Sequence, residues 1–298
     1  MATYYHEDTF LYHNGEFVRA AEAKIDLYSQ SLHYGYGVFE GIRAYKTISG
    51  ETRIFEAVRH YDRLKESARA INMPYVYDSE DLVKITYELL EKNKLQNAYI
   101  RPLVYAPANM GFNRNSESYL SIAVWEMAPF LGNKLLRVMT SSYQRPNPRG
   151  FHIEAKATGH YVNSLLASQE AKGAGYDEAL LTDMHGFVAE GPGANLFFEK
   201  DGALYTPPRG NILPGITRAT VIDICERIHI PVIEKLFTVE EMKKADAAFF
   251  CGTAAEIIGW ESLDDIPFQK RWHDSLSRRI QKAYADQVAG AEKSIALV

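Results

Sequence analysis

A lysine at position 156 lies in a segment that suits amine chemistry. Lys156 stands within EAKATGHY at 154–161, between a proline-rich loop at 145–150 and a helix predicted from about position 161. A lysine amine attacks carbonyl groups and forms a Schiff base when burial and neighbouring cations lower its pKa. Taken alone, a lysine is more often a solvated surface residue, so Lys156 needs support from its surroundings.

Three further segments contain the residue types of a ligand site. Glu190 ends a short predicted strand and runs into Gly-Pro-Gly, where the glycines permit close backbone approach to a ligand. The segment LPGITR at 213–218 begins a predicted helix, whose first N–H groups suit a phosphate. The segment FCGTAAE at 250–256 predicts a buried strand that ends in a turn of small residues. Ordinary turns have the same patterns, so none of these segments assigns a function by itself.

A candidate pocket wall comes from the alternation of residues 36–45. A strand there places Phe39, Gly41, Arg43 and Tyr45 on one face and the even-numbered residues, Glu40 among them, on the other. An arginine beside aromatic side chains is typical of a ligand pocket.

Regular elements must position these segments, and the first half of the chain predicts strands with two inserted helices. Asn14-Gly15 is a hairpin signal. Apolar residues recur at helical spacing around 57–71 and 80–92, and Asp78 or Ser79 can cap the second helix. Strand patterns follow at 98–105 and 119–127.

The second half of the chain predicts shorter elements punctuated by glycine and proline. A strand at 135–142 precedes the proline-rich loop, and a helix follows from about 161 to 172. A second helix begins near Thr217, and short strands are predicted at 177–183, 187–190, 195–199 and 203–206. The break in the pattern after residue 127 predicts domains at 1–128 and 135–298, joined by an interdomain loop at 129–134.

The bulk composition predicts an ordinary folded globular protein. Of 298 residues, 46% are hydrophobic and 24% are charged. The net charge is -5, and the 33 basic residues form no dense run, which excludes a nucleic-acid-binding patch. The N-terminus lacks a signal-peptide pattern, and no apolar run reaches the roughly 18 residues of a membrane span, so we expect a cytoplasmic protein. Cys225 and Cys251 show no metal-binding pattern, so we expect reduced core cysteines and no metal site.

In this order and spacing, the segments resemble the branched-chain aminotransferases, the fold type IV group of pyridoxal-phosphate enzymes. The resemblance covers nearly the whole chain. It is carried by LHYG at 32–35, FEGIR at 39–43, YIRPL at 99–103, the lysine and glutamate segments, LPGITR and GTAAE. It implies a two-domain α/β (α+β) fold with pyridoxal 5'-phosphate in the interdomain cleft.

The resemblance also implies roles for individual residues around the cofactor. Lys156 would be the catalytic residue, which forms an aldimine with the cofactor and shuttles a proton between the amino-acid α-carbon and the cofactor C4′. Glu190 would keep the pyridine nitrogen protonated so that the ring accepts electrons, and Tyr161 would hydrogen-bond the phenolic oxygen. The phosphate would be held by Arg63, Gly193, Ile216, Thr217 and Thr253.

For the substrate, the resemblance implies an apolar pocket beside a cation, which accepts a branched side chain as well as the carboxylate of glutamate. Strand alternation supports this, because Phe39, Gly41 and Arg43 share one face and Tyr99 and Arg101 share another. A second copy of the chain would complete the pocket, so we expect a homodimer or a higher homo-oligomer. The expected substrate contacts are Tyr34 and Phe112 of that second copy, together with Phe39, Gly41, Arg43, Tyr99, Arg101, Met127, Phe130, Thr253 and Ala254.

The expected reaction is a reversible ping-pong transfer of amino groups between leucine, isoleucine or valine and 2-oxoglutarate. Within the same fold, the alternatives are a D-amino-acid aminotransferase and an aminodeoxychorismate lyase, and FEGIR with YIRP argues against both. A non-catalytic binding protein of this fold is a further alternative. It would require loss of the lysine, the glutamate or the phosphate-binding segment, and all of these are present.

The chain departs from the commonest family pattern at a few positions. Ala194 stands where relatives often have glutamate, and the residues that follow the lysine, ATGH, are also unusual. Met127 and Phe130 stand where relatives often have tryptophan and tyrosine. Because methionine fills irregular gaps and phenylalanine lacks a hydroxyl, we expect a more adaptable pocket that also accepts large hydrophobic or aromatic donors.

Overall fold

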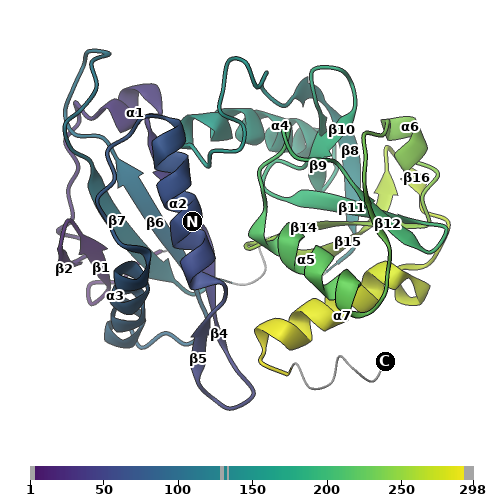
Figure 1. Ribbon diagram of the computed structural model, residues 1–298, viewed down its shortest axis with the longest axis horizontal. Helices are drawn as coiled ribbons and strands as arrows, with labels where there is room; N and C mark the ends of the chain where they lie inside the picture. Colours follow the sequence, from purple (N-terminus) through teal and green to yellow (C-terminus); the bar gives the residue numbers. More distant parts are fainter. Residues whose placement is uncertain (1–3, 128–130, 133, 292–298) are drawn as a thin grey trace. The chain divides into compact units, whose positions relative to one another are not determined.

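The computed structural model describes residues 4–127, 131–132 and 134–291, and these form two compact units (Figure 1). The first unit holds the described residues up to 127 together with Ala155–His160. The second holds the described residues at 131–154 and 161–291. The segment Ala155–His160, which carries Lys156, therefore packs with the first unit, whereas the sequence pattern placed it in the second domain. Positions 129, 130 and 133 of the predicted interdomain loop lie outside the described residues.

The first unit contains an antiparallel sheet in the order β2-β1-β7-β6-β4-β5, with β3 also paired to β6. Its strands are β1 (Phe10–His13), β2 (Glu16–Arg19), β3 (Gly37–Phe39), β4 (Ile42–Lys46), β5 (Thr52–Ile54), β6 (Ala98–Tyr105) and β7 (Tyr119–Trp125). Its helices are α1 (Gln30–Tyr34), α2 (Ala57–Ala70), α3 (Ser79–Lys92) and the short 3-10 helix Thr158–His160. The hairpin between β1 and β2 turns at Asn14 and Gly15, both with positive φ, as the Asn-Gly signal predicts.

The strand predicted across residues 36–45 is interrupted in the middle. β3 and β4 pair with β6 in one continuous register, Val38 opposite Val104 and Ile42 opposite Ile100. The residue between them, Glu40, donates its N–H to the carbonyl of Pro102, at 2.9 Å. Proline has no N–H to return that hydrogen bond, so the ladder breaks there and the chain forms two short strands.

Helices α2 and α3 cover one face of this sheet (Figure 1). On α2 the fully buried residues Tyr61, Leu64 and Ala68 follow the predicted helical spacing. Burying a large apolar side chain contributes about 1.5–3 kcal/mol, so this stripe anchors the helix on the sheet. Asp78 caps α3, since its side chain accepts from the N–H groups of residues 80 and 81.

The second unit contains a mixed sheet in the order β10-β9-β8-β15-β14-β11-β12-β13, with β16 paired to β15. The pairs of β8 with β9, β8 with β15 and β12 with β13 are parallel. Its strands are β8 (Leu136–Gln144), β9 (Glu178–Thr182), β10 (Val188–Glu190), β11 (Asn195–Lys200), β12 (Ala203–Thr206), β13 (Val232–Glu234), β14 (Ala247–Gly252), β15 (Glu256–Leu263) and β16 (Ile266–Pro267). Its helices are α4 (Tyr161–Gly173), α5 (Ile216–Arg227), α6 (Val239–Met242), α7 (Leu276–Val288) and the short 3-10 helix Trp272–Asp274.

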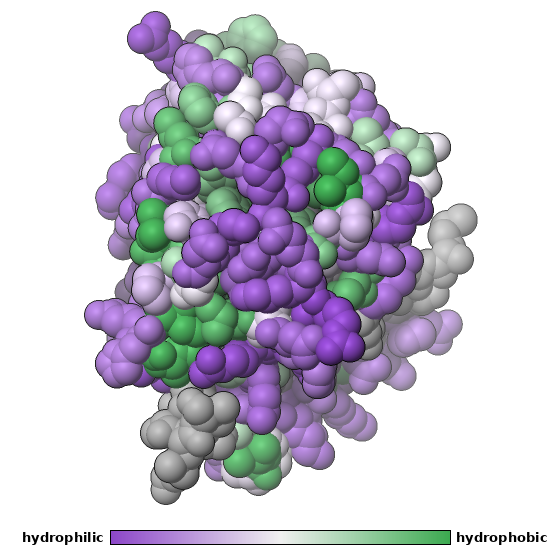
Figure 2. Space-filling model, turned by 90° about the vertical axis from the view of Figure 1, so that its right-hand side faces the viewer, coloured by the Kyte–Doolittle hydropathy of each residue, from purple (hydrophilic) through white to green (hydrophobic). Residues whose placement is uncertain are grey.

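Helix α4 packs on the second sheet through small residues. Ala167 and Ala171 form a buried cluster with Ala179 and Leu181 of β9. The larger apolar residues of the helix are exposed, among them Leu165 at 59%. On the face that Figure 2 shows, hydrophilic residues dominate and hydrophobic residues form separate patches.

Both cysteines are free and buried, as expected. Burial raises the pKa of the Cys225 and Cys251 thiols to about 12. Within the described part of the chain, no helix is both long and apolar enough to cross a membrane.

Candidate active site

The segment that carries Lys156 is held to the first unit by its backbone. The Lys156 N–H donates to the Ser67 hydroxyl at 3.0 Å, and its carbonyl accepts from the Phe39 N–H at 3.1 Å. Ala157 forms a β-bridge with Val38. These bonds explain why the segment packs with β3 and α2, and they place the Lys156 amine 5.0 Å from the centre of the Phe39 ring.

Arg63 lies on α2 and is buried, with 9% of its surface exposed. The alternative that sequence alone leaves open, a solvated position on the outer face of the helix, is therefore wrong. Its Nε and Nη2 donate to the two carboxylate oxygens of Glu40, at 2.7 and 2.9 Å. His60, one turn earlier on the same helix, also contacts this carboxylate through Nδ1, at 2.7 Å.

The predicted substrate residues of the first unit form an aromatic cage around a cation. The Arg101 guanidinium lies 4.8 Å from the Phe39 ring centre and 5.2 Å from that of Tyr99, and its Nη2 donates to the Tyr99 hydroxyl at 3.1 Å. The Arg101 Nε is buried and donates to none of the described residues. A guanidinium in this setting suits a carboxylate of the substrate.

Trp125 also belongs to this cage, although it is not among the substrate residues that the family resemblance implies. Its ring centre lies 5.1 Å from that of Tyr99 and 5.9 Å from the Arg101 guanidinium. Trp125 pairs with Tyr99 across β6 and β7, so strand register alone brings the two rings together. The alternation of residues 119–125 is the signal that places Trp125 on the face opposite the core residue Val124.

The other predicted substrate residues of this unit have different surroundings. The Nη2 of Arg43, which is also buried, donates to the backbone carbonyl of Met127 at 3.0 Å. Tyr34 and Phe112 stack at 5.3 Å as an exposed pair, with 45% and 90% of their surfaces exposed. Phe130 lies outside the described residues.

Gly41 leaves the space that the Tyr99 hydroxyl occupies. A Cβ at position 41 would lie 2.0 Å from that oxygen, so Tyr99 must move and its bond to Arg101 must break. We expect Gly41→Ala to lower kcat/KM for leucine by about 10²-fold, the typical cost of misplacing a substrate-positioning group. Steady-state kinetics check this, with Gly173→Ala as the control, since a Cβ there meets nothing within 4 Å. Wild-type kinetics for Gly41→Ala would show that the aromatic cage around Arg101 is not part of the substrate pocket.

In the second unit, Glu190 is buried and held by three groups, with 5% of its surface exposed. Its carboxylate accepts from the Asn195 side-chain amide at 2.9 Å and from the Leu213 N–H at 3.1 Å. The Arg145 Nε lies 2.9 Å from its other oxygen, an ion-pair distance without hydrogen-bond alignment. These contacts hold the carboxylate in place.

The other predicted cofactor residues of this unit lie on turns and at a helix start. Gly215 precedes α5 and has no side chain to cap the first N–H groups of the helix, which belong to Ile216 and Thr217. A Cβ at Gly215 would lie 1.9 Å from the Asn195 side-chain oxygen, so this position requires glycine. Of the remaining predicted residues, Tyr161 begins α4, Gly193 lies in the turn before β11, and Thr253 and Ala254 lie in the turn between β14 and β15.

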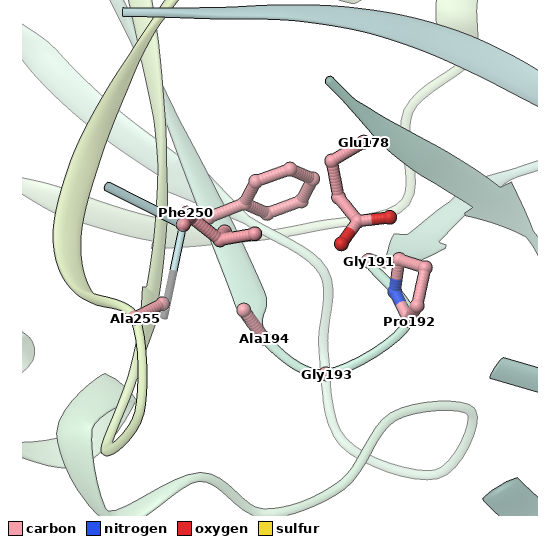
Figure 3. Close-up of a pocket in the computed structure, with 8 residues that line it drawn as sticks. Glu178, Gly191, Pro192, Gly193, Ala194, Phe250 and Ala255 are labelled. Carbon is pink, nitrogen blue, oxygen red and sulfur yellow. The ribbon is translucent and has the colours of Figure 1, made fainter. Parts of the chain in front are cut away.

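The turn of residues 191–194 closes over a small cavity (Figure 3). The cavity measures about 10 Å³ and is lined by Phe250, Ala194 and Glu178, whose carboxyl group points toward the turn. This volume is close to that of one water molecule. Burial raises the pKa of Glu178 above its usual value.

The residues present fit pyridoxal phosphate, the cofactor expected from the sequence. A lysine amine, a buried carboxylate, a buried arginine and an uncapped helix N-terminus match the aldehyde, the ring nitrogen and the phosphate of pyridoxal phosphate. The family model for amino-transferase class IV matches residues 37–263. The chain belongs to the class IV aminotransferase family.

Individual members of the class IV aminotransferase family match nearly the whole chain. A branched-chain-amino-acid aminotransferase of Pseudomonas aeruginosa is 38% identical over 289 residues, which cover 95% of this chain and 94% of that protein. The crystal structure of the branched-chain aminotransferase from Thermoproteus uzoniensis with norvaline has a TM-score of 0.92 at 36% identity and covers 96% of this chain and 97% of that one. The branched-chain amino acid aminotransferase from Thermobaculum terrenum, in its PLP-form, has a TM-score of 0.89 at 32% identity and covers 98% of this chain and 97% of that one. The fold type IV architecture expected from the sequence is confirmed.

For this aminotransferase, several residues of the candidate site were not found from sequence. Glu40 and His60 in the first unit, and Arg145 and Asn195 in the second, hold predicted site residues in place. Each of these four residues either contacts a site residue from a distant part of the sequence or lies on the core face of its element. The signal in the sequence that could have found one of them was Glu40 itself, a charged residue predicted to face the core.

Proposed function

We propose that the chain is a branched-chain aminotransferase that transfers amino groups between leucine, isoleucine or valine and 2-oxoglutarate. The observation that carries the proposal is the aromatic cage around Arg101. An apolar, aromatic-lined site with a half-buried cation suits a branched side chain in one half-reaction and the second carboxylate of 2-oxoglutarate in the other. The names of the relatives support this substrate class.

Pyridoxal 5'-phosphate is the proposed cofactor, and we assign each predicted cofactor residue a part in binding it or in the proton transfer. When bound, it supplies a sink for the electron pair released as the substrate α-carbon loses its proton. Lys156 would hold the cofactor and would move a proton between the substrate α-carbon and the cofactor C4′. Glu190 would keep a proton on the pyridine nitrogen, and Tyr161 would donate to the phenolic oxygen. Arg63, Gly193, Ile216, Thr217 and Thr253 would hold the phosphate.

A homodimer or a higher homo-oligomer is the proposed assembly, in which Tyr34 and Phe112 of one copy complete the substrate pocket of another. Tyr34 and Phe112 stack as an exposed pair, which supports a further copy as the partner, since large exposed apolar side chains in groups mark interaction surfaces. We propose the cytoplasm as the compartment, with which the free, buried cysteines are compatible.

The substrate class is tested with a panel of amino donors and 2-oxoglutarate. We expect parallel lines in double-reciprocal plots, the sign of a ping-pong mechanism. We also expect a shallow ranking of aliphatic donors, within about 10–200-fold in kcat/KM, because one methylene contributes only about 1–3 kcal/mol in an apolar pocket. The adaptable Met127 predicts that methionine and phenylalanine are accepted as well.

Two results of this panel would contradict the proposal. Strict rejection of phenylalanine would show that the pocket is narrow. A preference for D-amino acids would replace the branched-chain assignment with the D-amino-acid aminotransferase of the same fold.

A further inference from the structure

Glu40 is a charged residue in the core of the first unit. Its side chain has 0% of its surface exposed, and its neighbours in the chain alternation, Val38 and Ile42, belong to the hydrophobic cluster under α2. A buried ion pair is weak evidence for stability, because well-packed apolar residues of the same volume often stabilise a core equally well or better. The position therefore calls for a role other than packing.

The geometry around Glu40 orients one guanidinium. The Arg63 Nε and Nη2 donate to the two carboxylate oxygens, and this two-point contact fixes the plane of the guanidinium. His60 Nδ1 lies 2.7 Å from the second oxygen, and the Gly41 N–H donates to the same atom at 3.2 Å. The two hydrogen bonds from Arg63 to Glu40 hold the Arg63 guanidinium in place.

The electrostatics assign the protonation states of this cluster. Burial alone would raise the pKa of Glu40, but the charge of Arg63 and the hydrogen bonds from His60 and Arg63 outweigh it and hold that pKa well below its usual range. Burial lowers the pKa of His60, as do the charges of Arg63 and Lys156, against the opposing effect of Glu40. Glu40 is therefore ionised and His60 is a neutral donor.

The same cluster is adjacent to the lysine segment. The charge of Lys156 acts on His60, and Ser67, one turn after Arg63 on α2, receives the Lys156 N–H. Phe39, next to Glu40, donates to the Lys156 carbonyl. Neighbouring contacts thus hold both Arg63, the predicted phosphate ligand, and Lys156, the predicted attachment site of the cofactor.

We propose that Glu40 and His60 are positioning residues that orient Arg63 in advance for the phosphate of the cofactor. This rests on the proposed function, which makes Arg63 a phosphate ligand. An arginine held in its binding geometry loses little side-chain entropy when the phosphate arrives, so the benefit appears in cofactor affinity.

The test is a titration of cofactor-free protein with pyridoxal phosphate and, separately, with pyridoxal, which lacks the phosphate. We expect Glu40→Gln to raise the dissociation constant for pyridoxal phosphate by about ten- to a hundredfold, the equivalent of one charge-assisted hydrogen bond. The dissociation constant for pyridoxal should be unchanged.

A pair of variants at His60 tests the cluster without altering its charge. His60→Ala removes the donor, whereas His60→Asn places an amide nitrogen near the position of Nδ1. We expect weaker binding of pyridoxal phosphate for the alanine variant and recovery for the asparagine variant. Thr86→Val is the control, because it removes a buried hydrogen bond to Tyr61 in the same unit without touching the cluster. It should lower the melting temperature and leave the dissociation constant unchanged.

The outcomes separate this inference from the proposed function. If Arg63→Ala binds pyridoxal phosphate as tightly as the wild type does, the assignment of Arg63 as a phosphate ligand fails. If Arg63→Ala weakens binding but Glu40→Gln and His60→Ala do not, the positioning role is overturned and the proposed function stands. Equal weakening for pyridoxal and pyridoxal phosphate, or equal weakening by Thr86→Val, would also overturn it, because affinity would then follow stability.

Discussion

Replacing Lys156 by alanine should lower transaminase turnover by at least about 10⁴-fold, the upper end of what one positioned acid–base group contributes. The residue is expected to act twice, as the attachment point of the cofactor and as the group that moves the proton. The fold should survive, because the contacts that hold the segment use the backbone N–H and carbonyl of position 156, which alanine retains. Steady-state rates with leucine and 2-oxoglutarate measure the loss, and thermal melting measures the fold.

A covalent readout accompanies the kinetic one. Borohydride reduction of the cofactor-loaded wild type should attach the cofactor to the peptide that contains Lys156, and mass spectrometry should find no such adduct in the alanine variant. Lys84→Ala is the control, since that lysine is exposed and pairs only with Asp81 among the described residues. More than a trace of turnover in the Lys156 variant, or an adduct on another lysine, would remove Lys156 from the mechanism.

Local patterns predicted the two long helices and the first hairpin of the first unit, because these elements follow short-range rules. Helical spacing on α2, the cap at Asp78 and the Asn14-Gly15 turn each depend on residues within a few positions. The break between β3 and β4 depends on Pro102, some sixty positions later in the chain, so the alternation of residues 36–45 could not show it. In the second unit, helix α7 has apolar residues at Leu276, Ile280 and Tyr284, a helical spacing that can be recognised in the sequence.

The candidate site was predictable in its motifs and not in its supporting contacts. Lys156 and Glu190 stand in recognisable segments, but neither segment indicates what holds its side chain. Arg145 lies in a proline-rich loop far from Glu190 in sequence, and only the pairing of β8, β9 and β10 brings the loop to the carboxylate. The place of Trp125 beside Tyr99 could have been predicted, since their register follows once β6 and β7 are paired.

Replacing Glu190 by glutamine should leave the cofactor bound and slow the half-reaction with leucine by about 10²–10³-fold, the usual effect of removing one preorganised electrostatic group. The amide has nearly the shape of the carboxylate and can still accept from Asn195 and the Leu213 N–H. It carries no charge, so it cannot hold a proton on the pyridine nitrogen. Rapid mixing of cofactor-loaded protein with leucine measures the single-turnover rate, and absorbance measures the cofactor content. Glu154→Gln, which changes an exposed carboxylate paired with Arg209, should have the wild-type rate.

The same variant also breaks a buried ion pair, so stability must be separated from charge. Removing one partner of such a pair typically costs about 3–5 kcal/mol, and Glu190→Gln leaves the Arg145 guanidinium beside a neutral amide. Arg145→Gln breaks the same pair but keeps the carboxylate at position 190. If the charge of Glu190 acts on the ring nitrogen, Arg145→Gln should lower the melting temperature and retain most of the single-turnover rate. Equal slowing of the two variants would instead assign the effect to the ion pair, and Glu190 would lose its proposed role at the ring nitrogen.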